Sequence, residues 1–203
     1  MLRLLGNNNL NVTFHSPEAD PSNWPVAAVF VSNHMSQLDI NASAASIPRP
    51  IVYLAKESIR KVPLLGLLNE RVGTVFINRS NPQSAKQSIE RLHRTINDGI
   101  SVIVYPEGTR SSKGDLLPFK KGAFHLAQAT QTQVIPIHIH GTQFALPKGS
   151  FFVRRNPIHV RFGAPIDPPK TASKTDIDAF KNQAEQAILK MKEWHESHLD
   201  SPN

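Results

Sequence analysis

The sequence has no cysteine and no apolar run long enough to cross a membrane. Without cysteine the chain cannot build a disulfide scaffold, a zinc–thiolate site or a cysteine nucleophile. A membrane-spanning helix needs about 18 or more consecutive apolar residues. The first residues, MLRLLGNNNLN, are too short and too polar for a signal peptide. We therefore expect a cytoplasmic chain that is soluble or peripheral to a membrane.

Acidic side chains are outnumbered by basic ones. The 203 residues include 23 Lys and Arg against 16 Asp and Glu, so the net charge is +7 and the isoelectric point is near 9.9. This surplus favours an anionic partner: nucleic acid, a phospholipid surface, a phosphorylated metabolite or an acidic carrier protein. The length suits one domain over residues 1–203 with a single core, in which residues 1–25 form a polar lead-in segment.

Strand-like and helix-like segments alternate along the chain. Short β-branched runs between turn residues predict strands, and apolar residues at helical spacing predict helices. The alternation predicts an α/β fold, a single domain with a central, largely parallel sheet flanked by helices. The predicted strands are Leu10–Phe14, Val26–Val31, Ile51–Leu54, Thr74–Ile77, Ile100–Tyr105, Val134–His140 and His159–Phe162. The predicted helices are Ser36 to about Ser46, Ser58–Leu68, Asn81 to near Gly99, Gly122–Ala129 and an amphipathic C-terminal helix at residues 175–196.

The stretch from Val26 to Ile40 combines a buried strand, a turn and the start of a helix. Ser36 and Asp39 have the spacing of a capping box, which puts Asp39 in the first helical turn. His34 lies in the turn before that helix, so its imidazole can meet the Asp39 carboxylate. On one helix, residues five apart would point about 140° apart and would not meet. A neutral imidazole oriented by a carboxylate is a general base for an attacking hydroxyl.

The spacing of this pair is not specific by itself, because His-x4-Asp occurs four times in the sequence. The other pairs are His15/Asp20, His93/Asp98 and His195/Asp200. The first lies in a polar segment, the second on a predicted surface helix and the third in the C-terminal tail. Only His34 follows a buried strand and precedes a helix. The alternative is that Ser36 and Asp39 merely cap the helix and His34 is a polar loop residue.

Two further polar groups follow predicted strands. Arg79 follows Thr74–Ile77 beside the start of a helix, where main-chain N–H groups favour an anion. Glu107-Gly108-Thr109-Arg110 follows the predicted strand that ends at Tyr105. In parallel sheets the ligand crevice lies beyond the C-terminal strand ends, so both groups would meet His34 there. The alternative for each group on its own is that Arg79 is an ordinary surface residue and that Glu107 and Arg110 form a local ion pair.

Together these segments form an ordered set of four motifs. They are Asn33–Asp39, which matches N-H-x-S-x-x-D; residues 73–79, which match G-x-x-F-I-x-R; residues 105–111, which match F-P-E-G-T-R-S with Tyr105 in place of Phe; and Val134-Ile135-Pro136-Ile137. The set resembles the glycerolipid acyltransferase family, whose best-known members are 1-acyl-glycerol-3-phosphate (lysophosphatidic acid) acyltransferases. The resemblance implies the glycerolipid acyltransferase fold.

The resemblance also implies a reaction and roles for residues. His34 would deprotonate the free hydroxyl of 1-acyl-glycerol-3-phosphate, oriented by Asp39, and the acyl group of acyl-CoA or acyl-ACP would move to it and give phosphatidic acid. No cofactor or metal is implied. Pro136 would help to form the wall for the acyl donor. The positions that correspond to glycerol-phosphate binding are Arg79, Glu107, Gly108, Thr109 and Arg110. We expect Glu107 to hold Arg110 or to accept a hydrogen bond from the substrate.

Attachment to the membrane is the point where the sequence departs from the family. Bacterial relatives often have hydrophobic N-terminal helices, whereas mostly polar residues precede His34 here. Either the anchor is absent from this chain, or attachment is peripheral on the cytoplasmic face. Phe151 and Phe152 beside Arg154 and Arg155 could dip into an anionic surface. The alternative is that the two phenylalanines belong to the core.

Other functions stay open at this level. The acceptor could be glycerol-3-phosphate or another lysolipid, for example a lyso-aminolipid. A basic nucleic-acid or membrane-binding module without catalysis is the alternative from a different class, although we expect no nucleic-acid partner because no recognition motif is present. A serine hydrolase is disfavoured because the chain has no G-x-S-x-G elbow. His138 and His140 project from one face of a strand as two metal ligands would, but such pairs are mostly structural.

Overall fold

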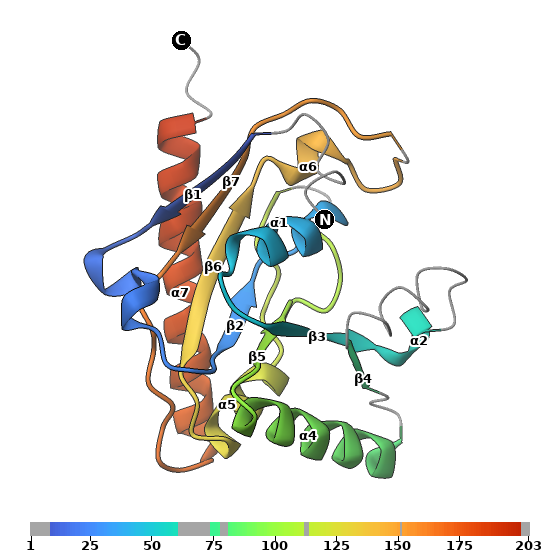
Figure 1. Cartoon of the computed structure of the whole chain (residues 1–203), viewed down its shortest axis with the longest axis vertical. Helices are drawn as coiled ribbons and strands as arrows, with labels where there is room; N and C mark the ends of the chain where they lie inside the picture. Colours follow the sequence, from blue (N-terminus) through green and yellow to red (C-terminus); the bar gives the residue numbers. More distant parts are fainter. Residues whose placement is uncertain (1–8, 61–73, 78–80, 112–113, 151, 200–203) are drawn as a thin grey trace.

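The β-branched segments of the chain assemble into one seven-stranded sheet with the order β1-β7-β6-β2-β5-β3-β4 (Figure 1). The computed structural model describes residues 9–60, 74–77, 81–111, 114–150 and 152–199. The strands are β1 Leu10–Phe14, β2 Val29–Ser32, β3 Ile51–Lys56, β4 Val75–Ile77, β5 Ser101–Val104, β6 Val134–His140 and β7 Ile158–Phe162. Every neighbouring pair is parallel except β6 and β7. The predicted α/β fold with a largely parallel sheet is confirmed.

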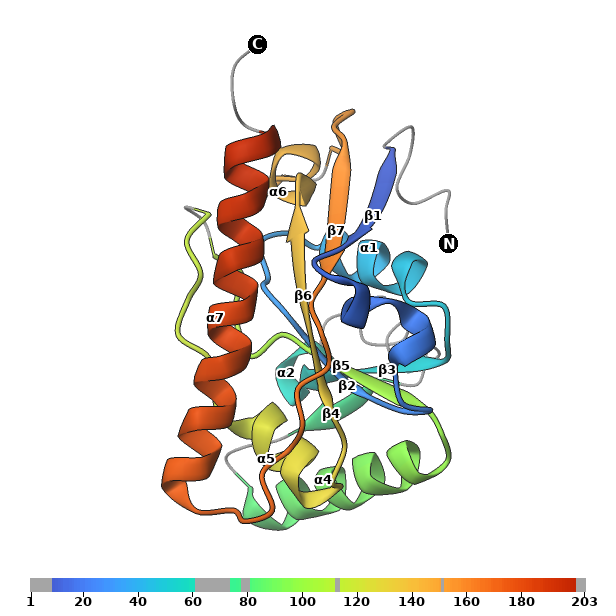
Figure 2. The same cartoon turned by 90° about the vertical axis from the view of Figure 1, so that its left-hand side faces the viewer.

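Helices cover both faces of the sheet, which is why its central strands are apolar on both sides. The helices are α1 Leu38–Ser46, α2 Glu57–Arg60, α4 Pro82–Asn97, α5 Gly122–Ala129, α6 Thr142–Ala145 and α7 Lys174–Leu199. Val29 and Val31 of β2 pack in the core that α4, α5 and α7 cover. Phe30, between them, packs in the second core beneath α1 and α6. Accordingly α7 and α1 lie on opposite sides of β6 (Figure 2).

Most predicted boundaries agree with the structure, and β1, α5 and β6 match them at both ends. The predicted strand from Val26 was wrong at its start, because β2 begins only at Val29. The N–H of Ala28 donates to the Ser101 hydroxyl at 3.1 Å instead of a strand neighbour, and Val26 is exposed. Sequence reasoning also missed α6. Of the predicted helix from Ser58, the part beyond Arg60 lies outside the described residues.

Helix α7 packs against β6 through a cluster of histidines. His195 belongs to this helix and is fully buried, so its expected place in a terminal tail was wrong. Its Nδ1 lies 2.6 Å from Nδ1 of buried His138 on β6. Burial lowers the pKa of His138 well below its ordinary value, and burial together with repulsion between a charged ring and His140, His159 and Arg161 lowers that of His195 to about 3. Both rings are therefore neutral in the folded protein near pH 7.

None of the described helices combines the length and the apolar character that a membrane span requires.

The buried histidines predict how stability depends on pH. A histidine whose pKa is lowered on folding stabilises fully above its unfolded pKa of 6.5, and this contribution is lost as the pH falls toward about 3. The loss is at most about 1.4 kcal/mol per pH unit and per histidine. We expect His195→Leu to have a shallower fall of Tm between pH 6.5 and pH 4 than the unsubstituted protein.

The matched control is His125→Leu, which replaces an exposed histidine on α5. It should keep the acid sensitivity of the unsubstituted protein. If the two variants lose Tm equally on acidification, the buried cluster is not the source of the effect.

Candidate active site

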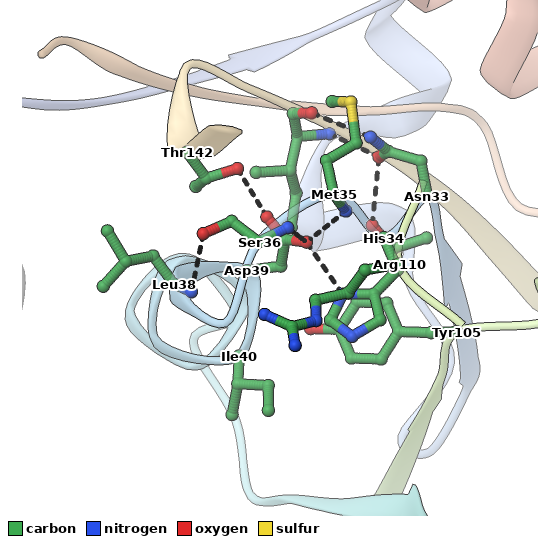
Figure 3. A network of polar contacts seen from close by, with 12 residues as sticks. Asn33, His34, Met35, Ser36, Leu38, Asp39, Ile40, Tyr105, Arg110 and Thr142 are labelled. Atoms are coloured by element: carbon green, nitrogen blue, oxygen red, sulfur yellow. Dashed lines mark hydrogen bonds and ion pairs between the residues drawn. The ribbon is translucent and has the colours of Figure 1, made fainter. Parts of the chain in front are cut away.

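The imidazole of His34 and the carboxylate of Asp39 meet in the turn between β2 and α1 (Figure 3). His34 Nδ1 lies 2.8 Å from Asp39 Oδ2, so the convergence that the sequence predicts is present. The side chain of His34 is 16% exposed, whereas that of Asp39 is fully buried. A carboxylate only accepts, so Nδ1 carries the hydrogen in the neutral ring and Nε2 keeps its lone pair. The geometry therefore presents a base at Nε2.

Four donors surround the Asp39 carboxylate. Oδ2 accepts from His34 Nδ1 and from the main-chain N–H groups of Met35 at 2.7 Å and Ser36 at 2.8 Å. Oδ1 accepts from the hydroxyl of Thr142, the first residue of α6, at 2.5 Å. The same carboxylate thus folds the turn around itself and orients the imidazole. Capping and orientation, which the sequence offers as alternatives, are two parts of one arrangement.

Helix α1 begins at Leu38 with Gln37 as its N-cap residue, so the predicted N-cap at Ser36 was one residue early, and only the half of the predicted capping box in which Asp39 accepts from Ser36 is present. The Ser36 hydroxyl accepts from the Leu38 N–H at 3.2 Å, while the Ser36 N–H donates to Asp39. Asn33 fixes the other end of the turn to β6. Its side-chain nitrogen donates to the Ile139 carbonyl at 2.9 Å, and its oxygen accepts from the Ile139 N–H at 2.8 Å.

The loop after β5 holds His34 at three places. The ring of Tyr105 stacks on the imidazole, with centroids 4.3 Å apart. Glu107 Oε1 accepts from the His34 N–H at 2.7 Å, and the Ser111 N–H donates to the His34 carbonyl at 2.8 Å. Tyr105 replaces the Phe of the motif, and its hydroxyl lies 3.1 Å from that of Ser43 on α1. Burial raises the pKa of Tyr105 well above its ordinary value.

From the sequence we expected Glu107 to hold the Arg110 guanidinium or to accept from the substrate. In the structure its carboxyl group has other partners than Arg110. Its side chain is buried, and its second oxygen accepts from the Leu117 N–H at 3.0 Å. Both oxygens are therefore occupied by main-chain donors. The Glu107 pKa is raised to about 7, mainly by burial and to a smaller extent by the negative charge of Asp39, against the lowering effect of the hydrogen bonds from Leu117 and His34. The carboxyl group braces the turn that carries His34.

The remaining predicted residues occupy different surroundings. Arg110 is partly exposed near His34 (Figure 3), and Gly108 and Thr109 are exposed in the same loop. Gly108 has φ +71°, a conformation that favours glycine. Pro136 is buried within β6, opposite Val31 of β2. Arg79 lies outside the described residues, so the structure does not bring it together with the others.

A cavity of about 360 Å³ lies beside the turn. Its lining includes Met35, Ser111, His140, Phe144, Lys148 and Lys192. Across the described parts of the chain, no group of three or more histidine, aspartate or glutamate side chains could hold a metal ion.

Comparison with known proteins identifies the family of the chain. The family described as Acyltransferase matches residues 11–140, well over half of the chain. The chain belongs to this acyltransferase family. The resemblance that its motifs predict is therefore confirmed.

Several curated relatives of the chain are named for one activity. The chain is 41% identical over 140 residues to the 1-acyl-sn-glycerol-3-phosphate acyltransferase of Cocos nucifera, and the alignment covers 68% of this chain and 46% of the relative. It is 40% identical over 110 residues to the human 1-acyl-sn-glycerol-3-phosphate acyltransferase beta, with 54% and 40% covered. The chain spans about half the length of the curated relatives it matches first.

A solved structure has the same fold. The crystal structure of the 1-acyl-sn-glycerophosphate acyltransferase PlsC from Thermotoga maritima is 26% identical, with a TM-score of 0.73. The similarity covers 93% of this chain and 73% of that one. The expected fold of this acyltransferase family is thus confirmed.

The buried Glu107 predicts a second dependence on pH. Because its pKa is raised from 4.5 to about 7 on folding, its protonation stabilises the folded state fully below pH 4.5, and this stabilisation is lost as the pH rises through about 7. Gln cannot titrate, but it replaces one acceptor oxygen with a donor. We expect Glu107→Gln to lower Tm at pH 5 and to lower it less at pH 8.

The measurement is the difference in Tm between variant and unsubstituted protein across that range. Glu193→Gln, at an exposed position on α7, is the control and should give a difference that does not change with pH. A constant difference for Glu107→Gln as well would contradict the raised pKa.

Proposed function

We propose that the protein transfers a fatty acyl group from an acyl thioester to the free hydroxyl of 1-acyl-glycerol-3-phosphate, giving phosphatidic acid. The observation that carries the proposal is the His34–Asp39 pair, 2.8 Å apart, with Nε2 left as the free ring nitrogen. The names of the curated relatives support this acceptor. Acyl-CoA and acyl-ACP are both suitable donors, because each supplies the same thioester.

The residues of the site account for each step of the transfer. His34 Nε2 takes the proton of the acceptor hydroxyl, and the oxygen attacks the thioester carbonyl. The tetrahedral intermediate collapses, the carbon–sulfur bond breaks and the departing thiolate takes the proton back from the imidazolium. Asp39 keeps the hydrogen of the neutral ring on Nδ1 and stabilises the imidazolium that forms. Tyr105 and Glu107 act as positioning residues, because they contact the ring and the main chain of His34.

We assign the acceptor phosphate to the loop that carries Arg110. This assignment rests on the resemblance of Arg79, Gly108, Thr109 and Arg110 to the glycerol-phosphate-binding positions of the family. A guanidinium group binds phosphate through two parallel N–H donors, which suits a monoester. Glu107 also corresponds to one of these family positions, but its two oxygens already accept main-chain hydrogen bonds. We therefore assign it no direct contact with the phosphate.

The first test is a transfer assay with purified protein, lysophosphatidic acid and a long-chain acyl-CoA. His34→Ala should lower turnover by about 100-fold or more, the usual size of a general-base contribution. Asp39→Asn should lower turnover and also Tm, because a carboxamide cannot accept from all four donors. His15→Ala and His93→Ala repeat the sequence spacing outside the site and should leave turnover nearly intact.

An equal loss of turnover in His93→Ala would contradict the role of His34. The same assay decides between acceptors: faster transfer to glycerol-3-phosphate or to a lyso-aminolipid would replace lysophosphatidic acid as the acceptor. His195 is not a suitable control, because its buried ring packs between α7 and the sheet.

We further propose that the protein acts as a peripheral protein at an anionic membrane surface. The segment from α6 to Arg155 exposes apolar and basic side chains together: Phe144, Lys148, Phe152, Val153, Arg154 and Arg155. Phe152 is 83% exposed, so the core interpretation was wrong for this residue, whereas Phe151 lies outside the described residues. The cytoplasmic leaflet is the expected surface, because anionic lipids are enriched there.

The exposed segment is continuous with the candidate active site. Thr142 at the start of α6 donates to Asp39, and the ammonium group of Lys148 donates to the Arg110 carbonyl at 2.9 Å. The main-chain N–H of Arg154 donates to the Ala145 carbonyl at 2.7 Å, which fixes the segment to α6. Insertion of this segment into the headgroup layer would bring a lipid acceptor close to His34.

Charge reversal tests the membrane surface. Replacing Arg154 and Arg155 with Glu should weaken binding to anionic vesicles and lower activity on vesicle substrate, yet spare activity on detergent-dispersed substrate. Binding of the unsubstituted protein should fall as salt rises, because exposed charges are screened within about 10 Å at 0.1 M. Lys170→Glu with Lys174→Glu, at exposed positions near the start of α7, is the control. Equal binding to neutral and anionic vesicles at high salt would contradict the proposal that electrostatic attraction to anionic lipid holds the protein at the membrane.

A further inference from the structure

We propose that Lys120 is a further cation of the acceptor-phosphate site and selects a phosphate monoester. The inference rests on the proposed function. Lys120 lies outside the motif that carries Arg110, and no sequence pattern singled it out. The structure brings its ammonium group onto the loop after β5, at Gly108.

The contact depends on the absence of a side chain at position 108. A Cβ on Gly108 would clash with Lys120 Nζ and would lie 3.3 Å from its Cε and 3.4 Å from its Cδ. The end of the lysine side chain therefore fills the space that glycine leaves open. The Lys120 N–H also donates to the Pro106 carbonyl at 3.0 Å, so main chain and side chain both pack on this loop.

The charge of Lys120 is not balanced by a neighbour. Among the residues that the structure describes, its ammonium group forms no hydrogen bond or ion pair, whereas Lys121 next to it pairs with Asp178 at 2.6 Å. Glu107, the carboxylate next to Gly108 in the sequence, is buried and accepts from two main-chain N–H groups. The loop after β5 thus carries Arg110 and has the ammonium group of Lys120 packed on it at Gly108, and both side chains reach solvent.

This arrangement suits a phosphate monoester rather than other lipid headgroups. A monoester phosphate carries between one and two negative charges near pH 7, because its second pKa is about 6. The guanidinium of Arg110 provides planar, paired donors, and the ammonium of Lys120 provides a point charge. A phosphodiester such as lysophosphatidylcholine carries one negative charge and a positive choline group, so it gains less from a second cation. Lys120 is therefore a specificity-determining residue.

The experiment compares Lys120→Met with Lys121→Met, two adjacent substitutions that remove the same charge and keep an unbranched side chain. Equilibrium binding of lysophosphatidic acid, measured by calorimetry below its micelle concentration, should weaken about tenfold in Lys120→Met, the effect of roughly one charge-assisted contact. Binding in Lys121→Met should not change. Lys120→Arg, which keeps the charge, should bind nearly as the unsubstituted protein does. Binding of lysophosphatidylcholine should be the same in all four proteins.

In the transfer assay the same loss should appear as a higher KM for lysophosphatidic acid with kcat nearly unchanged, because the contact is made before and during the reaction. Equal binding of lysophosphatidic acid in Lys120→Met and Lys121→Met would overturn the inference, as would an equal loss for lysophosphatidylcholine. The binding measurement is independent of turnover. If the unsubstituted protein binds lysophosphatidic acid but transfers no acyl group, the proposed function fails and the difference between the two variants still decides the role of Lys120.

Discussion

The site depends on one buried carboxylate. Asp39 has no exposure to water and accepts from four donors, of which two belong to the main chain of its own turn, one to the imidazole and one to α6. A buried carboxylate without such partners would be costly, so the surrounding segments are held where their donors reach it. The turn after β2 and the start of α6 are thereby joined, although Asp39 and Thr142 are far apart in sequence. His34 takes its orientation from the same group.

The topology of the sheet explains why the crevice opens at this point. Strands β2 and β5 are parallel neighbours, but β2 leads into α1 on one face of the sheet and the loop after β5 leads into α5 on the other. The connections diverge from two adjacent strand ends, which is the geometry of a ligand crevice in open α/β sheets. The β5 loop crosses this opening and contacts His34 through Tyr105, Glu107 and Ser111. The turn that carries His34 is therefore supported from a second strand.

The sequence predicted the features that depend on neighbouring residues. Strand and helix patterns, the place of Asp39 in the first turn of α1 and the meeting of His34 with Asp39 all follow from spacing within a few residues. Of the contacts between residues distant in the chain, it predicted that the group after β5 would meet His34, but not which atoms make the contact. Thr142 follows a strand that no local pattern links to Asp39. The expectation that Glu107 holds Arg110 was wrong because the bond from the Leu117 N–H, ten residues along the chain, cannot be read from the motif. Lys120 reaches Gly108 only through the path of a long loop.

The buried hydroxyl of Tyr105 has a consequence for how this site can change in evolution. A phenol removed from water needs a partner, and here Ser43 on α1 lies within hydrogen-bond distance of both Tyr105 and Tyr53. Loss of the serine hydroxyl alone would leave Tyr105 without this partner directly beneath the imidazole. The Phe that the family motif has at this position needs no such partner, because it stacks without a hydroxyl. Positions 43 and 105 are therefore coupled: we expect loss of the hydroxyl at 43 to cost less stability when Tyr105 is changed to Phe as well, while the contact of Ser43 with Tyr53 remains a separate constraint.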